Sequence, residues 1–289
     1  MTGHTRSAKH MSLSEAVSRY VDDGSSVALE GFTHLIPFAA GHEIIRQKKR
    51  RLTLIRMTPD LIYDQMIGMG CASKLIFSWG GNPGVGSLHR FRDAVENAWP
   101  QALELDEHSH AAMAAAYQAG AAHLPFAMLR GYLGSDLAKV NPQIRWIRCP
   151  YTNERLATVP ALRPDVTVIH AQQADFAGNV FLSGIVGVQR EAALAAKLVI
   201  VTVEEVVEKL QVPMNSNILP HWVIAAVCHV PNGAAPSYAH GYSERDNRFC
   251  KRWDGIARER ASFQDWMNIM VMDSHDFSEY EKKMAAETK

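Results

Sequence analysis

The run VTVIH at residues 166–170 and the run LVIVT at residues 198–202 decide the fold class of this 289-residue chain. Both are rich in β-branched residues and lack polar alternation, which is typical of strands that are covered on both faces. Residues 191–196, between the two runs, favour a short helix. A strand, a helix and a second strand in this order predict part of a parallel sheet.

The same alternation extends toward the N-terminus. The capping box Ser12-Leu-Ser-Glu15 predicts a first helix, which Gly24 ends. Further strands are expected at residues 27–29, 52–55, 74–79 and 102–105, and further helices at 37–47, 61–68, 85–98 and 109–122. This order predicts an α/β fold with an open, mainly parallel sheet and helices on both faces.

Ligands of such sheets bind at the carboxyl ends of the strands. The turns at residues 31–37, 80–86, 106–110 and 172–179 each follow an expected strand. We therefore expect these four turns to lie along one rim of the sheet and to carry the functional residues.

The chain is expected to form one domain with a tail and an extension. Residues 1–11 are polar and lack the apolar core of a signal peptide, which indicates a flexible N-terminal tail. Residues 12–289 contain no repeat and no low-complexity linker, which favours a single domain. From about residue 213 the pattern loosens into a C-terminal extension, with a strand expected at 223–230 and a helix at 249–267. Trp253 and Trp266 are the expected apolar anchors of that helix.

The composition excludes several classes of protein. Thirty basic and thirty acidic residues cancel, so no overall field attracts nucleic acid or an anionic membrane surface. No apolar run has the length of a membrane span. The four cysteines lie far apart and form no CxxC pair, which favours reduced thiols in a cytoplasmic protein.

The segment DEHSH at residues 106–110 concentrates polar side chains where a strand meets a helix. His108 and His110 are two positions apart, about 200° around a helix, so they do not form a metal site of the HExxH kind. Ser109 or Asp106 can cap the helix. A cap needs only one such residue, and the surplus at a helix N-terminus also suits an oxyanion or a carboxylate substrate. The sequence leaves both interpretations open.

The remaining turns allow a binding role and a structural role alike. Gly31 permits a close approach of the backbone to a ligand, or a plain tight turn. The loop with Gly81 and Asn82 can contact a substrate or be a surface turn. Gln172 and Gln173 can orient a carbonyl or bind a carboxylate, or only hydrogen-bond their own loop. His170 alone is typical of a satisfied core histidine, and no P-loop or nucleophile elbow completes a mechanism.

Several blocks in a fixed order resemble a known family. They are the early DG, VAL, GFT and proline block (23–37), NPGV before RFR (82–92), DEHSH (106–110), AGAAHLPF (119–126) and VIHAQQA followed by Gly178 (168–178). These blocks are similar to those of the α (A) subunit of class I CoA-transferases, and within that family to the glutaconate CoA-transferase type. The resemblance extends from about residue 12 to about residue 273.

The resemblance implies a fold shared with ribose-phosphate isomerases and an obligate β subunit. The implied enzyme moves CoA between carboxylic acids, through a glutamyl-CoA thioester on that partner, while the α subunit supplies the facing wall. It implies a cytoplasmic hetero-oligomer, α2β2 or α4β4, with coenzyme A and acyl-CoA as substrates. No permanently bound cofactor, metal, nucleic acid or membrane is implied.

Residue by residue, the resemblance points to two catalytic positions. His110 falls where many relatives place a glutamine that donates to the thioester oxyanion. Glu107 falls where related ring-cleaving CoA-thioester hydrolases carry an essential glutamate. The substrate-binding candidates are Gly31, Phe32, Thr33, Gly81, Asn82, Gln172 and Gln173.

The sequence departs from the family pattern at two positions of the glycine-rich turn. Glu30 replaces a glycine of the common GGF signature, and Ile36 stands where a glycine precedes the proline. Both changes bear on which acyl group fits.

Two other functions remain as alternatives. The first is a CoA-thioester hydrolase on the same scaffold, with Glu107 as general base for ring cleavage. The second is a sugar-phosphate sensor, which the neutral charge and the missing DNA-binding segment disfavour. A β chain with the nucleophilic glutamate would favour transfer, and a β chain without it would favour hydrolysis.

Overall fold

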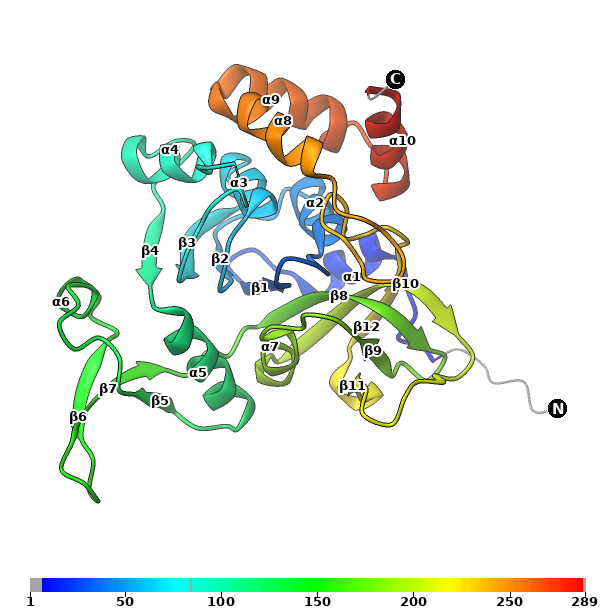
Figure 1. The fold of residues 1–289 in the computed structure, drawn as a ribbon. Helices are drawn as coiled ribbons and strands as arrows, with labels where there is room; N and C mark the ends of the chain where they lie inside the picture. The colour runs from blue at the N-terminus through cyan, green and yellow to red at the C-terminus, as the bar shows by residue number, and fades with distance from the viewer. Residues whose placement is uncertain (1–6, 84, 288–289) are drawn as a thin grey trace.

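The main sheet of the computed structural model is open and mainly parallel, as the sequence predicts (Figure 1). The structure describes residues 7–83 and 85–287. Within them the strand order is β11-β9-β8-β1-β2-β3-β4, and β10 joins β8 to β12. The parallel strands are β1 (Ser26–Glu30), β2 (Leu52–Ile55), β3 (Ala72–Phe77), β4 (Glu104–Glu107), β8 (Val166–Asp175), β10 (Leu198–Val207) and β12 (Ala226–His229). The antiparallel strands β9 (Val180–Leu182) and β11 (Asn217–Leu219) extend the β8 side.

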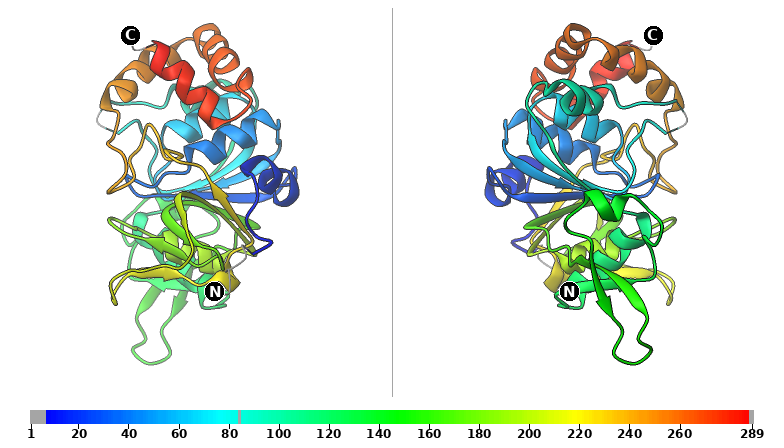
Figure 2. Two further views of the ribbon diagram at one scale, coloured as in Figure 1. Left: turned by 90° about the vertical axis from the view of Figure 1, so that its right-hand side faces the viewer. Right: turned by 90° about the vertical axis from the view of Figure 1, so that its left-hand side faces the viewer.

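Helices cover both faces of this sheet, which confirms the predicted fold class (Figures 1 and 2). One face carries α2 (Phe38–Arg46), α3 (Leu61–Gly68), α4 (His89–Asn97), α8 (Asn247–Arg258), α9 (Arg260–Met267) and α10 (Phe277–Glu287). The other face carries α5 (His110–Ala121) and α7 (Gln189–Ala195). Side chains of β1 alternate between the two cores: Val27 and Leu29 pack on the first side, and Ala28 packs on the second.

The ends of several elements differ from the prediction. β8 continues to Asp175 because its last residues pair with β10 on one side and β9 on the other. Gln172 and Gln173 therefore lie in a strand, not in the expected turn. β4 ends at Glu107, so Asp106 and Glu107 are strand residues, and the expected helix over 249–267 is divided at Glu259 into α8 and α9.

The chain between α5 and β8 forms a small antiparallel sheet that was not predicted. It consists of β5 (Phe126–Leu129), β6 (Arg145–Arg148) and β7 (Arg155–Pro160), with the short helix α6 (Leu137–Val140) beside it (Figure 1). Ala127, Ala157 and Val159 pack it into the core under α5. β6 and β7 mix arginine with apolar residues, and β5 is an apolar run of only four residues, so the pattern is weaker than that of the long buried strands of the main sheet.

The first residues that the structure describes also pack on the sheet. Residues 7–11, expected as part of a loose tail, lie along β12: Val227 N–H donates to Lys9 O at 2.9 Å and Met11 N–H donates to Val227 O at 3.1 Å. The helix α1 (Leu13–Tyr20) follows, and Ser12 caps it as expected. The expected tail residues 1–6 lie outside the described part.

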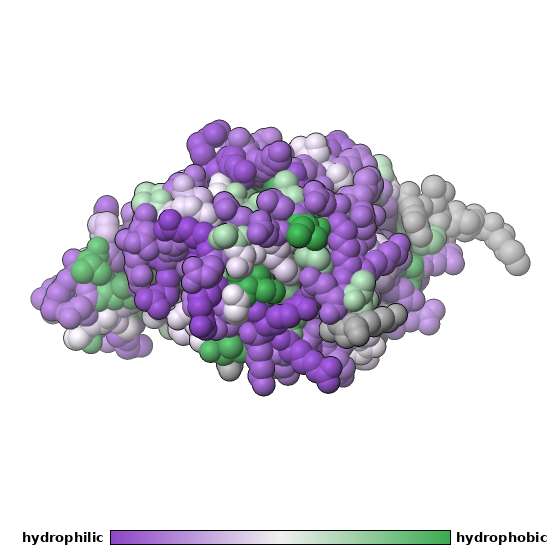
Figure 3. All heavy atoms as spheres, turned by 90° about the horizontal axis from the view of Figure 1, so that it is seen from above, coloured by the Kyte–Doolittle hydropathy of each residue, from purple (hydrophilic) through white to green (hydrophobic). Residues whose placement is uncertain are grey.

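The C-terminal segment is joined to the main core by aromatic side chains. Trp253 and Trp266 are both buried and pack edge to face, at 5.3 Å between ring centroids, which confirms them as anchors. The outer face of this helical layer is mostly hydrophilic, with scattered apolar side chains (Figure 3). No helix in the described ranges combines the length and the apolar character that a bilayer crossing requires.

Candidate active site

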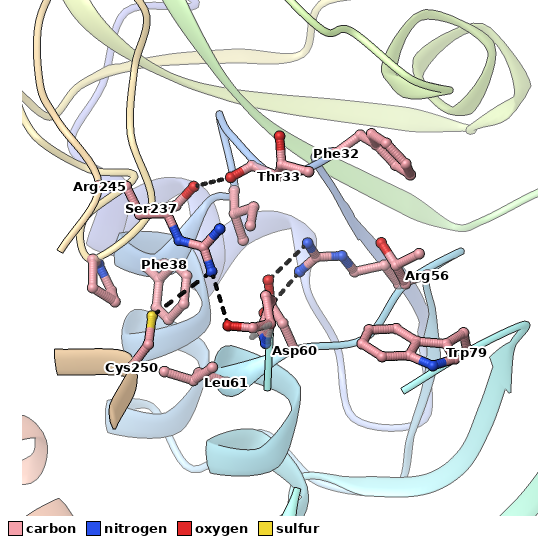
Figure 4. A pocket seen from close by; sticks show the side chains of 14 residues that line it. Phe32, Thr33, Phe38, Arg56, Asp60, Leu61, Trp79, Ser237, Arg245 and Cys250 are labelled. Atoms are coloured by element: carbon pink, nitrogen blue, oxygen red, sulfur yellow. Dashed lines mark hydrogen bonds and ion pairs between the residues drawn. The ribbon is translucent and has the colours of Figure 1, made fainter. Parts of the chain in front are cut away.

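A cavity of about 190 Å³ lies at the carboxyl ends of β1, β2 and β3 (Figure 4). Phe32 and Thr33 line it from the turn after β1, Arg56 and Asp60 from the segment after β2, and Trp79 from the turn after β3. Two of the four turns expected along a common rim, 31–37 and 80–86, therefore line one cavity, in agreement with the position of ligand sites in open parallel sheets.

The turn after β1 requires its glycine. A Cβ atom on Gly31 would lie 2.7 Å from the Leu35 carbonyl oxygen and 2.9 Å from the His34 carbonyl oxygen. Thr33 and Leu35 both have positive φ, 65° and 53°, which is costly for residues other than glycine. The Ser237 hydroxyl donates to the Thr33 carbonyl at 3.0 Å, so the segment before α8 braces this turn.

The floor of the cavity is a buried ion pair. Arg56 donates one N–H to each oxygen of Asp60, at 3.1 and 3.0 Å, and a further one to the Gly31 carbonyl at 3.0 Å. Burial raises the pKa of Asp60, and the Arg56 charge opposes this shift. Asp60 is the only carboxylate among the described residues that line the cavity, and Arg56 occupies both of its oxygens. Among the described residues of the lining there is thus no free carboxylate to act as a nucleophile.

Glu30, which departs from the family pattern, is buried directly behind this turn. Its Oε1 accepts from the Tyr117 hydroxyl at 2.8 Å and from the Met57 N–H at 3.1 Å. Burial raises the pKa of Glu30 to about 7, although the Arg56 charge and these hydrogen bonds lower it. Glu30 therefore ties β1 to β2 and to α5, and it titrates near neutral pH.

The residues of the DEHSH segment separate into a buried part and an exposed part. His108 Nε2 lies 2.9 Å from Asp106 Oδ1, and both residues are buried. Ser109 caps α5 by accepting from the Ala112 N–H at 3.2 Å, as predicted for one of the two candidate caps. Glu107 and His110 are exposed at the rim. The two histidines do not converge, and the described residues include no group of three or more His, Cys, Asp or Glu side chains placed to hold a metal ion.

His110 is oriented by the end of β3. Its Nδ1 lies 3.1 Å from Ser78 Oγ, and the Ser78 hydroxyl donates to the Met57 carbonyl at 2.6 Å. Since the hydroxyl proton is already used, Nδ1 is the donor in the contact with Ser78. A neutral His110 then presents Nε2 as an acceptor, and only the imidazolium form donates from Nε2 to an oxyanion. Ser78 and Trp79 are adjacent, so this rim borders the cavity.

The structure places the other substrate-binding candidates in different surroundings. Gly81 lies against the Trp79 indole, where a Cβ atom would approach the ring to 2.6 Å. Asn82 is buried and donates to the Cys250 carbonyl at 2.7 Å. Gln172 is buried and exchanges two hydrogen bonds with the Ser183 backbone, and Gln173 contacts Glu205 at 2.8 Å. In this chain the amide nitrogen of Asn82 and the side chains of Gln172 and Gln173 already have protein partners.

A glutamine that no sequence motif marks supports the turn after β1. The side-chain amide of Gln189, at the start of α7, donates toward the carbonyls of Glu30, Leu35 and His170 at 3.3 to 3.4 Å. His170 is a satisfied core histidine, as predicted: it is buried, with Nδ1 on Thr202 and Nε2 on Glu204, both at 2.8 Å.

The basic groups of the cavity were not predicted from the sequence either. Arg56 follows a short strand without any motif, and Arg245 lies more than 150 residues further along the chain in a turn-rich segment. Only the order of the elements indicated that Arg56 follows a strand. Nothing in the pattern indicated that Arg245 and Cys250 reach the same cavity.

Comparison with known proteins agrees with this geometry. A sequence profile described as Coenzyme A transferase matches residues 10–229. The A subunit of 3-oxoadipate CoA-transferase from Pseudomonas knackmussii is 66% identical over 96% of this chain and 99% of that protein. The A subunit of glutaconate CoA-transferase from Acidaminococcus fermentans is 31% identical over 96% of this chain and 92% of that protein.

The glutaconate enzyme also matches in three dimensions. Its crystal structure superimposes with a TM-score of 0.90, over 96% of this chain and 93% of the matched chain. A cholesterol ring-cleaving hydrolase subunit from Rhodococcus jostii is 30% identical but aligns with only 59% of this chain and 62% of that protein. The profile match, the near full-length relatives and the shared fold together show that this chain belongs to the coenzyme A transferase family.

Proposed function

We propose that this chain forms one wall of the active site of a heteromeric CoA-transferase, and that the partner subunit supplies the glutamate that attacks the acyl-CoA thioester. The chain is the A-type subunit of such an enzyme. The observation that carries the proposal is the cavity itself: among its described lining residues the only carboxylate, Asp60, is fully engaged by Arg56. Since the lining offers no free carboxylate, we infer that the attacking carboxylate belongs to the partner subunit.

The rim next to the cavity suits the reaction that such a carboxylate performs. Attack on the thioester carbonyl creates an oxyanion and then an acyl anhydride with release of CoA thiolate. The thiolate attacks the anhydride at the partner's glutamyl carbonyl, which gives a glutamyl-CoA thioester and releases the donor acid as its carboxylate. Donors fixed near the oxyanion stabilise it. His110, exposed and held by Ser78, is our candidate for this role, and Glu107 lies beside it.

We further propose a dicarboxylic acid such as 3-oxoadipate as substrate. The relative with 66% identity over nearly the full length of both chains carries that substrate in its name. Glu30 and Tyr117 give this site a buried contact that a glycine at position 30 would lack. Hydrolysis is the second candidate, because Glu107 is free to act as a general base, but the hydrolase likeness covers a smaller part of the chain.

The assembly and the compartment are part of the same proposal. We expect a hetero-oligomer with equal numbers of both subunits, with acyl-CoA and free acid as substrates and without a resident cofactor. Three of the four cysteines are buried and all four are free thiols, which suits a reducing compartment such as the cytoplasm.

The test is activity with and without the partner. We expect the purified chain alone to show no CoA transfer, and the chain coexpressed with its partner subunit to transfer CoA to 3-oxoadipate, as measured by chromatography of the CoA esters. Robust transfer by the chain alone would contradict the missing nucleophile. Release of free CoA without transfer to any acid would favour the hydrolase.

A further inference from the structure

We propose that Arg245 binds the distal carboxylate of a dicarboxylic acyl group and thereby selects dicarboxylic over monocarboxylic substrates. The inference rests on the proposed function and adds to it a residue of this chain that recognises the acyl group. Arg245 precedes α8 and reaches the cavity from a part of the sequence far from the three strand ends (Figure 4).

The charges that line the cavity do not cancel. Its described charged residues are Arg56, Asp60 and Arg245. Arg56 is 1% exposed and bonded to both oxygens of Asp60, so these two form a neutral pair. The Arg245 charge remains as the net charge of the cavity.

The contacts of Arg245 leave room for an anion. Its guanidinium donates to the Pro83 carbonyl at 3.3 Å and lies 4.0 Å from Cys250 Sγ, both of which are uncharged. The Arg245 charge lowers the pKa of Asp60, which opposes the effect of burial. Within the described chain no carboxylate forms an ion pair with Arg245. A guanidinium has five N–H donors in a planar fork that matches a carboxylate.

The rest of the cavity suits the carbon chain of a short acid. Phe32, Ile36, Phe38, Leu61 and Trp79 give it apolar walls. A volume of about 190 Å³ is smaller than the roughly 300 to 1,000 Å³ of sites that hold drug-sized ligands. It therefore fits a short acyl group better than the nucleotide part of CoA. Such a group, with its reacting end at the rim and its chain along the apolar walls, meets Arg245 with its distal end.

This arrangement predicts selection by an unpaired charge. A dicarboxylic acyl group pairs with Arg245, whereas a monocarboxylic group of the same length brings a methyl group to the guanidinium and removes its access to water. Sites built to hydrogen-bond a polar group discriminate strongly against analogues that lack it. Arg245 is partly exposed, so we expect discrimination of about 10- to 100-fold rather than the larger ratios of fully buried sites.

The experiment compares Arg245→Met with wild type in the complex with the partner subunit. The CoA acceptors are 3-oxoadipate and 3-oxohexanoate, at one fixed CoA donor. In a double-displacement reaction kcat/KM for the acceptor reports the second half-reaction alone. We expect the ratio of the two kcat/KM values to fall about 10- to 100-fold in Arg245→Met, with the value for 3-oxohexanoate kept within a few-fold.

Two further variants sharpen the test. Arg245→Lys keeps the charge without the fork and should retain more of the preference than Arg245→Met. Arg248→Met changes an exposed arginine on the first turn of α8 and should leave the ratio unchanged. An unchanged ratio in Arg245→Met, or an equal loss for both acids, would overturn the inference. A wild-type complex that transfers CoA to neither acid would overturn the proposed function, and this inference with it.

Discussion

The rim after β4 and the cavity after β1 and β2 lie side by side but are built in opposite ways. On the rim Glu107 and His110 are exposed, and His110 Nδ1 lies against the Ser78 hydroxyl. In the cavity floor Arg56 and Asp60 are buried and form an ion pair through both carboxylate oxygens. Buried charges need such partners, whereas exposed ones are free to meet a ligand.

This contrast suggests a division of labour. The cavity is organised within this chain, and changes there should alter stability and substrate choice. In the proposed assembly the partner subunit and the substrate face the exposed rim. Changes at the rim should therefore alter the rate of CoA transfer and leave the stability of the chain nearly unchanged.

The largest effect is expected from Glu107→Ala and His110→Ala. Each should lower kcat of the partnered enzyme at least tenfold without unfolding the chain, because both side chains are exposed. Loss of one oxyanion donor costs about 100- to 1,000-fold in well-studied acyl-transfer sites, and His110→Ala should approach this range. Steady-state kinetics and thermal unfolding of the same preparations check the two parts.

Glu104→Ala provides the matched control. Glu104 is exposed at the start of the same strand and pairs with Lys74 at 2.7 Å. Surface pairs of this kind contribute only about 0 to 1 kcal/mol. Wild-type kcat in Glu107→Ala or in His110→Ala would return that residue to a purely structural role.

The two regions also differ in what the sequence reveals. The rim could be predicted from the sequence because Glu107 and His110 lie in one short segment, at the junction of a strand and a helix. Strand and helix order followed from apolar periodicity, which is local. The turn after β1 was predicted as part of the site, but the charged residues of the cavity were not, because Arg56, Asp60 and Arg245 carry no motif and only the folded chain brings Arg245 into the same cavity as the other two.

The polar candidates that proved to be engaged show the same limit. Gln172 and Gln173 were expected in a turn, but pairing with β9 and β10 extends β8 through them. Strand length of this kind is set by which strands pair alongside, and not by local composition. Gln189 does reach the turn after β1, yet its own neighbourhood in sequence contains no sign of this.

In the interior of the chain, Glu30 should make the free energy of unfolding depend on pH. The folded pKa of Glu30 is about 7, against 4.5 for an ordinary glutamate. The folded chain therefore keeps a proton that the unfolded chain loses between pH 4.5 and 7. The contribution of this group to the free energy of unfolding falls as the pH rises through that window and is constant above it.

Glu30→Gln removes this dependence while an amide oxygen keeps the acceptor for Tyr117 and Met57. The variant should match wild type near pH 5 and exceed it at pH 8 by up to about 3 kcal/mol. Denaturant unfolding at a series of pH values measures the difference. Parallel stability curves for the two proteins would mean that Glu30 is ionised in the folded state at all these pH values.

The smallest effect is expected where the two regions meet, at Ser78. Ser78→Ala removes the hydroxyl that anchors His110 Nδ1, and a single hydrogen bond of about 1 kcal/mol corresponds to roughly a fivefold loss in kcat. Ser78→Thr keeps a hydroxyl at this position and should recover most of the rate.

The position of the proton on the His110 imidazole distinguishes a lost hydrogen bond from a change in packing alone. Because the Ser78 hydroxyl donates to the Met57 carbonyl, neutral His110 should carry its proton on Nδ1 in the wild-type chain and lose this preference in Ser78→Ala. Nitrogen-15 NMR of the histidine-labelled chain distinguishes the two tautomers, and the His110→Ala spectrum identifies the signals. A proton on Nε2 in the wild type would mean that the hydroxyl donates to His110 instead. Neutral His110 could then polarise the thioester directly, and the requirement for the imidazolium form would disappear.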